Sequence, residues 1–294
     1  MGEPAVPDAG DGAGVPTCYR HPGRETYLSC VRCGRPACPD CLRSAPVGQQ
    51  CVECVREGNQ GVRRAGTVFG GRPTSSAAVT WTLVGINVLF YLIELVHPAI
   101  ADDWALVGRL GPSIGVADGQ WYRLLTAEFL PGTGLSGLLD IAFNMWALIL
   151  VGPALEQLLG RLRFLAVYLL SAVGASVLFY LLAPASAAAL GASGAIFGLF
   201  AAWFVVSRRL HLDSRAIVFL IGLNLAFSFT FHSFIAWQAH VGGLIAGGVL
   251  TAAYAYAPRN QRMLVQAGAT VAVLAVLVIA VLARNSELAG SALG

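Results

Sequence analysis

The sequence contains no lysine and few charged residues for its length. Asp, Glu and Arg make up 12% of the 294 residues, against about 25% in soluble globular domains. The 19 basic residues are all arginine, the net charge is only +3, and 56% of the chain is hydrophobic. This composition excludes a cytosolic enzyme, a disordered chain and a densely basic nucleic-acid binder. It is typical of a protein that crosses a membrane several times.

Cysteine is absent from most of the chain, because all seven cysteines lie between Cys18 and Cys54. The first 17 residues have no basic start and no apolar block, so we expect a disordered segment and no signal peptide. The composition therefore predicts five regions. They are a disordered N-terminus (1–17), a metal-binding domain (18–56), a linker rich in Arg, Gly and Ser (57–78), a transmembrane domain (79–284) and a tail (285–294).

The cysteine-rich segment contains four pairs of potential metal ligands, each pair separated by two residues. In chain order the pairs are Cys18 and His21, Cys30 and Cys33, Cys38 and Cys41, and Cys51 and Cys54. A tight turn of this length aims two ligand atoms at one ion, and eight ligands suffice for two tetrahedral Zn²⁺ sites. So short a segment cannot build an adequate apolar core, so we expect two structural zinc ions to stabilise it.

The alternative for this segment is a network of disulfides. An odd number of cysteines and a histidine in register with the pairs favour zinc. A cross-braced arrangement, with pairs one and three on one ion and pairs two and four on the other, is favoured, and sequential pairing stays open. The segment resembles B-box zinc fingers, which implies a role in binding a cytoplasmic protein. Reduced thiolates also indicate the cytoplasm.

Seven apolar stretches of helical length follow. They cover residues 79–97, 138–158, 164–182, 193–207, 216–231, 237–256 and 264–283. Arginines concentrate before the first stretch and in every second loop after it, at Arg63, Arg64, Arg72, Arg161, Arg163, Arg208, Arg209, Arg215, Arg259 and Arg262. This pattern predicts a multi-pass protein of the plasma membrane with a cytoplasmic N-terminus. The long loop 98–137 then lies outside.

Polar residues inside apolar spans are costly, so each is a candidate functional residue. The candidates are Glu94, Asp140, Asn144, Glu156, Ser193, Asn224 and His240. The topology puts Ser193 and His240 at similar depth near the outer ends of two helices, and each helix carries glycines spaced by four residues that allow close packing. The two side chains could be a nucleophile and its general base. Alternatively, Ser193 is a packing residue and His240 a pore or proton-relay residue.

Several segments resemble the rhomboid family of intramembrane serine proteases. The strongest likenesses are Gly191–Gly198 (GASGAIFG) and Ala239–Gly243 (AHVGG). Trp121–Thr126 (WYRLLT) is similar to the family's long first loop, and Phe143–Met145 (FNM) to its second span. The resemblance covers about residues 79–256. It implies an all-α bundle of six membrane helices, to which this chain adds one C-terminal helix and the small zinc-stabilised domain.

The resemblance also implies roles for individual residues. Ser193 would attack the scissile carbonyl, and His240 would accept its proton and pass it to the leaving amine. The backbone N–H of Ser193 and the side chain of Asn144 would hold the oxyanion, with Gly191 beside the cavity and Phe197 packed on the histidine. Substrates would be single-span membrane proteins with helix-destabilising residues, because an intact helix hides its peptide bonds. No cofactor is expected in catalysis.

Two residues differ from the family pattern. Asp140 stands where family members usually have an oxyanion-binding histidine, and Pro131 replaces a second histidine. Residues 140 and 144 share a helix face, so Asp140 is expected to face the same cavity. There it could repel the oxyanion, donate a hydrogen bond if protonated, or orient His240; alternatively it stabilises a helix N-terminus.

The sequence thus predicts a serine endopeptidase of the rhomboid type that cleaves transmembrane substrates with Ser193 and His240. The alternative that Asp140 and Pro131 favour is a catalytically impaired relative that binds transmembrane clients without cutting them. A transporter with His240 as proton relay would have inverted repeats and broken helices, and the sequence has neither.

Overall fold

The computed structural model describes residues 14–60, 66–73, 76–111 and 113–291. The chain divides into two compact units, Met1–Arg64 and Ala65–Gly294. Of the predicted disordered segment 1–17, residues 1–13 lie outside the described residues, and Thr17 forms part of a strand.

The N-terminal unit consists of two short antiparallel hairpins and one helix. Strands β1 (Thr17–Cys18) and β2 (His21–Glu25) form the first hairpin, and β3 (Leu42–Ala45) and β4 (Gly48–Cys51) form the second. The 3-10 helix η1 (Pro39–Cys41) precedes β3, and α1 (Val52–Asn59) follows β4. The buried cluster of this unit is made almost entirely of cysteine side chains, with Ala37 and Leu42 as its aliphatic members. An apolar core of this size is too small to hold the unit together by itself.

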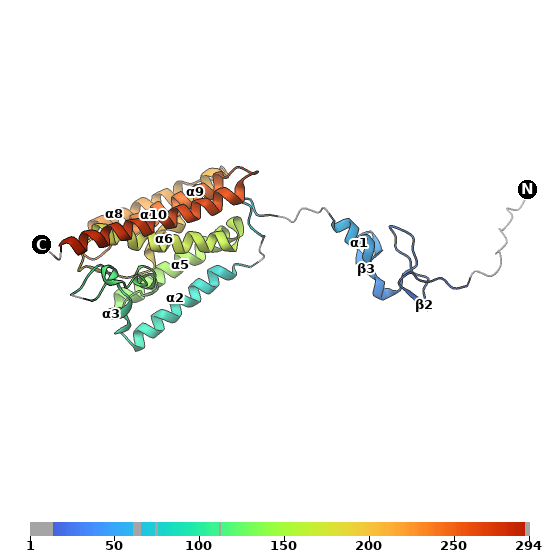
Figure 1. Ribbon diagram of the computed structural model, residues 1–294, viewed down its shortest axis with the longest axis horizontal. Coiled ribbons are helices and arrows are strands. Elements are labelled where there is room, and N and C mark those ends of the chain that lie inside the picture. The colour runs from blue at the N-terminus through green and yellow to red at the C-terminus, as the bar shows by residue number, and fades with distance from the viewer. Residues whose placement is uncertain (1–13, 61–65, 74–75, 112, 292–294) are drawn as a thin grey trace, which may run out of the picture. The chain divides into compact units, whose positions relative to one another are not determined.

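The second unit is a bundle of seven long helices in the described part of the chain, one at each predicted apolar stretch (Figure 1). They are α2 (Ala78–Val96), α5 (Gly134–Leu159), α6 (Arg161–Leu182), α7 (Ser193–Arg209), α8 (Arg215–Thr230), α9 (Trp237–Tyr256) and α10 (Arg262–Ser291). The predicted all-α membrane fold is confirmed. Among the described residues, four helices (α2, α5, α6 and α10) are long and apolar enough to cross a membrane, and α8 is a shorter apolar helix.

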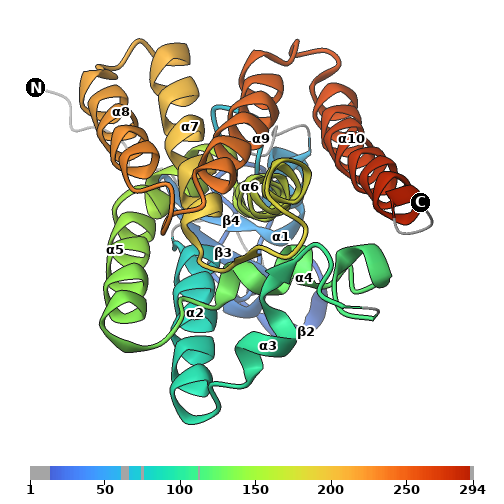
Figure 2. The same cartoon turned by 90° about the vertical axis from the view of Figure 1, so that its left-hand side faces the viewer.

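Helices α7 and α9 contact each other and α6. Figure 2, which views the bundle along its length, shows the three helices next to one another. Their glycines let the backbones touch. A Cβ atom on Gly243 would overlap the carbonyl oxygen of Gly194, and one on Gly247 would lie 2.5 Å from the carbonyl oxygen of Gly198. The small residues that lower the apolar character of these helices are therefore the ones that pack them together, as the glycine spacing predicts.

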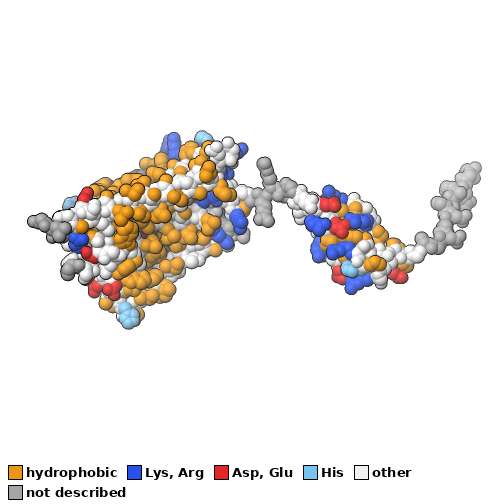
Figure 3. All heavy atoms as spheres, in the orientation of Figure 1, with side chains coloured by type: hydrophobic (Ala, Val, Ile, Leu, Met, Phe, Trp, Pro, Cys, Tyr) orange, Lys and Arg blue, Asp and Glu red, His pale blue; other side chains and the backbone are white. Residues whose placement is uncertain are grey.

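The surface of the bundle is strongly apolar. Figure 3 shows hydrophobic side chains covering the sides of the helices, with arginines gathered at one end and acidic side chains at the other. Exposed side chains on the outer helices include Leu89, Trp146, Phe219, Val276 and Ile279. Such a belt between two polar ends fits the hydrocarbon layer of a bilayer.

The long loop between α2 and α5 contains several short elements. They are α3 (Ile100–Trp104), β5 (Leu106–Val107), η2 (Val116–Asp118), α4 (Arg123–Thr126) and η3 (Ala127–Phe129), and β5 pairs with β6 (Ala188–Ala189) just before α7. The buried Arg123 guanidinium holds the loop together, donating to the carbonyl oxygens of Ala105 (2.7 Å) and Asp102 (3.0 Å). The end of this loop contacts the start of α7, because Glu128 in η3 accepts the backbone N–H of Ala195.

Parts of the predicted linker and tail belong to the bundle. Phe69 is buried against the helices, and its carbonyl oxygen accepts a hydrogen bond from the Gln266 side chain (3.0 Å). Helix α10 continues through most of the predicted tail to Ser291, and Arg109 donates to the carbonyl oxygen of Leu288 (2.7 Å). Parts of both segments therefore contact the helical unit.

Candidate active site and metal centres

Ser193 and His240 lie within hydrogen-bonding distance of each other. Ser193 is the first residue of α7 and His240 lies in the first turn of α9, with 2.8 Å between the Ser193 Oγ and the His240 Nε2. The Phe197 ring stacks on the imidazole at a centroid distance of 4.2 Å and an angle of 11°. His240 is buried, whereas Ser193 is half-buried. The glycine contacts between α7 and α9 make this approach possible.

The second ring nitrogen of His240 has a partner on a third helix. The Nδ1 atom lies 2.7 Å from the Oγ of Ser228, a buried residue of α8. Asp140 therefore does not orient the imidazole. Ser228 was missed by the sequence analysis, and the only local signal is its position four residues after Asn224, on the same helix face.

Asn144 and Asp140 line one narrow cavity with Ala192, the residue before Ser193. Both come from α5, one helical turn apart. Gly191 lies two residues before Ser193 and has a φ of 121°, a conformation that favours glycine. Its N–H donates to the carbonyl oxygen of Ala127 (3.0 Å). Asp140 thus lies close to Gly191 and lines the same cavity as Asn144 and Ala192.

The Asp140 carboxylate is incompletely paired. Its Oδ2 atom is buried and has no hydrogen-bond partner among the described residues. A Cβ atom on Gly191 would lie 3.3 Å from it. Asp140 lies in the second turn of α5, so it does not stabilise the N-terminus of its own helix. Asp140 therefore places an oxygen without a described hydrogen-bond partner in the same cavity as Asn144.

A second acidic side chain, Glu128, contacts the first turn of α7 from the long loop. The sequence did not predict this contact. Its Oε2 accepts the backbone N–H of Ala195 (3.2 Å), and its Oε1 accepts the hydroxyl of Ser176 (3.3 Å). Glu128 is buried in η3, at the end of the long loop. The sequence feature that could have indicated its burial is its position between the apolar residues Ala127 and Phe129. Its side chain thus binds the backbone at the N-terminus of the helix that carries Ser193.

The remaining polar candidates have structural partners. Glu156 accepts hydrogen bonds from the backbone N–H groups of Val79 (3.1 Å) and Thr80 (2.9 Å), so it caps α2 from a neighbouring helix. Glu94 accepts the N–H of Gly132 (3.1 Å). The Asn224 side chain donates to the carbonyl oxygen of Leu220 (2.9 Å), within its own helix.

In the N-terminal unit, the eight predicted ligands form two groups among the described residues. Cys18, His21, Cys38 and Cys41 make up one group, and Cys30, Cys33, Cys51 and Cys54 the other. This is the cross-braced pairing. Within each group all ligand atoms lie within 4.8 Å of one another, and all seven cysteines are free.

The separations of the ligand atoms fit one tetrahedral ion per group. His21 Nδ1 lies 3.4 Å from the Sγ atoms of Cys38 and Cys41 and 3.7 Å from that of Cys18, and the Sγ atoms of Cys33 and Cys51 lie 3.9 Å apart. A zinc tetrahedron with Zn–S of about 2.3 Å and Zn–N of about 2.0 Å has edges of roughly 3.5–3.8 Å. Arg35 donates to the Cys33 Sγ (3.4 Å) and lowers the pKa of that thiol, which favours the thiolate that a metal needs.

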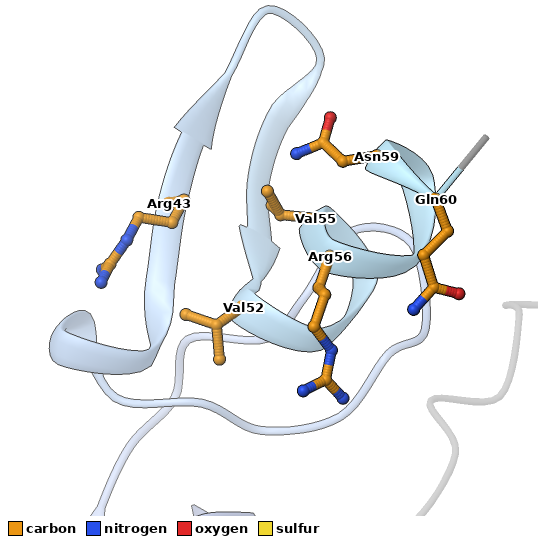
Figure 4. A pocket seen from close by; sticks show the side chains of 6 residues that line it. All are labelled: Arg43, Val52, Val55, Arg56, Asn59 and Gln60. Atoms are coloured by element: carbon orange, nitrogen blue, oxygen red, sulfur yellow. The ribbon is translucent and has the colours of Figure 1, made fainter. Parts of the chain in front are cut away.

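A groove on the N-terminal unit lies between β3 and α1 (Figure 4). Val52 and Val55 form its apolar part, and the other lining residues are Arg43, Arg56, Asn59 and Gln60. None of these residues belongs to either ligand group. The groove therefore offers apolar and positively charged contacts that metal binding leaves free.

Comparison with known proteins identifies the family. The rhomboid domain family model matches residues 118–258, which include Asn144, Ser193 and His240. The putative rhomboid protease YdcA of Bacillus subtilis is 38% identical over 146 residues, covering 48% of this chain and 71% of that protein. The chain belongs to the rhomboid family.

Two further relatives are named as rhomboid proteases. GluP of Bacillus subtilis is 32% identical over 205 residues, covering 68% of this chain and 38% of GluP. AarA of Providencia stuartii is 26% identical over 219 residues, covering 63% of this chain and 75% of AarA. A rhomboid domain in a multi-pass membrane protein, with relatives named as proteases, supports intramembrane proteolysis as its activity. The metal-binding unit lies outside the matched residues 118–258.

Proposed function

We propose that this rhomboid-family protein is a serine endopeptidase that cleaves peptide bonds of transmembrane proteins with Ser193 and His240. The observation that carries the proposal is the 2.8 Å separation between the Ser193 Oγ and the His240 Nε2, on two helices in glycine-to-glycine contact. A hydroxyl at this distance from an imidazole can pass its proton to the ring as it attacks.

In the proposed reaction, the Ser193 Oγ bonds to the carbonyl carbon and its proton moves to Nε2. The oxyanion lies in the cavity lined by Ala192 and Asn144, within reach of the Ser193 N–H and the Asn144 amide. As the C–N bond breaks, His240 gives the proton to the departing amine. A water molecule then hydrolyses the acyl-enzyme, with His240 again as base.

The substrates we propose are single-span membrane proteins with helix-destabilising residues near the outer boundary. Ser193 lies at the end of its helix away from Arg208 and Arg209. If the arginine-rich end faces the cytoplasm, as the positive-inside rule implies, the site opens outward. The plasma membrane is then the location that we propose.

Labelling with a serine-reactive phosphonate tests the reactivity of Ser193 directly. We expect one labelled residue, Ser193, in the purified protein, and no labelling of Ser193→Ala or of the base variant His240→Ala. Labelling elsewhere, or equal labelling of His240→Ala, would contradict the proposed roles.

Asp140 supports one alternative, a client-binding protein with impaired catalysis. Its unpaired oxygen lies in the cavity proposed for the oxyanion, where one correctly placed donor is worth about 2.7–4 kcal/mol. We expect Asp140→His to raise kcat because it replaces an acceptor with a donor. If only Asp140→His cuts, the natural protein is the client-binding form; if wild type also cuts, the protease assignment stands.

For the N-terminal unit we propose two structural Zn²⁺ ions and a role in binding a cytoplasmic protein. The groove of Figure 4 suits a partner segment that carries apolar side chains, to contact Val52 and Val55, and acidic side chains, to contact Arg43 and Arg56. Peptide display on the intact protein tests this. We expect such segments to be enriched with the wild-type protein and not with the double variant Arg43→Glu/Arg56→Glu. Equal enrichment with the double variant would exclude the groove as the binding site.

A further inference from the structure

The Ser228 hydroxyl lies between two polar groups whose chemistry fixes its orientation. Its Oγ lies 2.7 Å from the carbonyl oxygen of Asn224 and 2.7 Å from the Nδ1 of His240. A carbonyl oxygen can only accept, so the single hydroxyl proton of Ser228 points at Asn224. The Ser228 oxygen is then an acceptor toward His240, and Nδ1 must carry the proton.

This assignment determines the tautomer of His240. A neutral imidazole protonated at Nδ1 has its free electron pair at Nε2, which is the atom 2.8 Å from the Ser193 Oγ. The hydrogen bonds therefore run in one direction, from Ser193 to His240, to Ser228 and to the Asn224 carbonyl. When Nε2 takes the serine proton, the Nδ1–H bond to Ser228 persists and orients the imidazolium.

The burial of Ser228 distinguishes it from an ordinary helix serine. Serines in helices often donate to the carbonyl four residues earlier, and this bond alone would explain the contact with Asn224. Among the residues of α8, however, only Ile217 and Ser228 are buried, while Phe219, Leu223 and Phe227 are exposed. Ser228 is thus one of two buried residues on a largely exposed helix, and its hydroxyl contacts His240.

No other described group competes for this role. The described hydrogen-bond partners of the His240 ring are Ser193 and Ser228, and Phe197 covers one face of the ring. No carboxylate in the described residues reaches Nδ1. We propose that Ser228 is a positioning residue that holds His240 in the Nδ1–H tautomer, so that the site is a relay across α7, α9 and α8. The inference rests on the proposed protease function.

The test compares Ser228→Ala with Ser228→Thr, which keeps the hydroxyl. The matched control is Thr230→Ala on the same helix, because Thr230 makes the same type of bond, to the carbonyl of Ala226 (2.8 Å), but is exposed. We expect Ser228→Ala to lower kcat about tenfold in liposomes, the value of one neutral hydrogen bond, with KM unchanged. Ser228→Thr should restore most of kcat, and Thr230→Ala should leave it unchanged.

A second readout does not depend on activity. In ¹⁵N-histidine-labelled protein, the His240 signals should show a protonated Nδ1 in wild type and in Thr230→Ala, and a mixture of tautomers in Ser228→Ala. An unchanged tautomer and unchanged kcat in Ser228→Ala would overturn the proposal, as would an equal loss of kcat in Thr230→Ala. If wild type neither cuts nor reacts with phosphonate but the tautomer follows Ser228, the protease function fails and the positioning role stands.

Discussion

In the N-terminal unit, eight ligand atoms from residues within one short segment form two groups, each less than 4.8 Å across. In the helical unit, Ser193 and His240 are separated by 47 positions in the chain and meet because two helices touch at their glycines. The first unit has almost no apolar core and depends on ligands in tight turns. The second has an extensive core and depends on the absence of side chains at a few positions. The two units should therefore fail under different perturbations.

The largest effect is expected from Gly243→Ala. The added Cβ would overlap the carbonyl oxygen of Gly194, a backbone atom that cannot move without displacing α7. We expect a loss of about 3 kcal/mol or more in unfolding free energy and loss of cleavage, since overpacking separates the helices. Thermal unfolding in detergent and a cleavage assay measure both.

Gly248→Ala is the matched control on α9, because its Cβ would lie at an ordinary 3.5 Å from the Cβ of Ala201. It should keep both stability and activity, and both variants should retain the metal content of wild type. Equal behaviour of the two glycine variants would refute the close-contact explanation.

Metal removal should destabilise the N-terminal unit and leave the helical unit unaffected, the reverse of the Gly243→Ala result. We expect a chelator to make residues 14–60 sensitive to added protease while the melting temperature of the helical unit stays unchanged, because metal ligation replaces a core only in the first unit. Metal analysis should give two zinc ions per chain in wild type and one in Cys33→Ser, which removes a ligand from one group. A chain without zinc, or a helical unit whose melting temperature falls with the chelator, would show that metal does not stabilise the first unit alone.

A smaller effect is expected from Glu128→Gln. The amide keeps one acceptor oxygen, and its NH2 group can only donate, so either the Ala195 N–H or the Ser176 hydroxyl loses its acceptor, at a cost of about 1–3 kcal/mol. Thermal unfolding and the rate of phosphonate labelling of Ser193 report this. Asp103→Asn removes a carboxylate from an exposed position in the same loop and should change neither quantity. An unaltered Glu128→Gln variant would show that this carboxylate does not hold α7.

The smallest effect on proteolysis is expected from deletion of residues 1–56. The proposed catalytic residues and their hydrogen-bond partners all lie in the unit Ala65–Gly294. We expect the truncated protein to cleave a generic substrate at the wild-type rate. Loss of cleavage by a truncated protein that still unfolds at the wild-type temperature would show that the metal-binding unit takes part in the reaction.

The sequence predicts best what depends on local spacing. The Cys and His pairs are two residues apart, so a turn suffices to group them, and the glycine spacing on α7 and α9 marks the faces that touch. The topology and these helix faces predicted that Ser193 and His240 meet, and the resemblance to the rhomboid family predicted that Phe197 packs on the imidazole. Local spacing carries no information about partners on other segments, and it therefore missed Ser228 on α8 and Glu128 in the long loop. The docking of Phe69 on the helices depends on residues nearly 200 positions away, as the Gln266 hydrogen bond shows.

The proposed function requires Ser193 to act as a nucleophile with His240 as its base. Cleavage of a helix-destabilised transmembrane substrate in liposomes tests this directly, with wild type, Ser193→Ala, His240→Ala and Asp140→His compared at equal protein content. We predict cleavage by wild type, none by Ser193→Ala or His240→Ala, and faster cleavage by Asp140→His. Cleavage by Ser193→Ala at the wild-type rate would show that Ser193 is not the nucleophile.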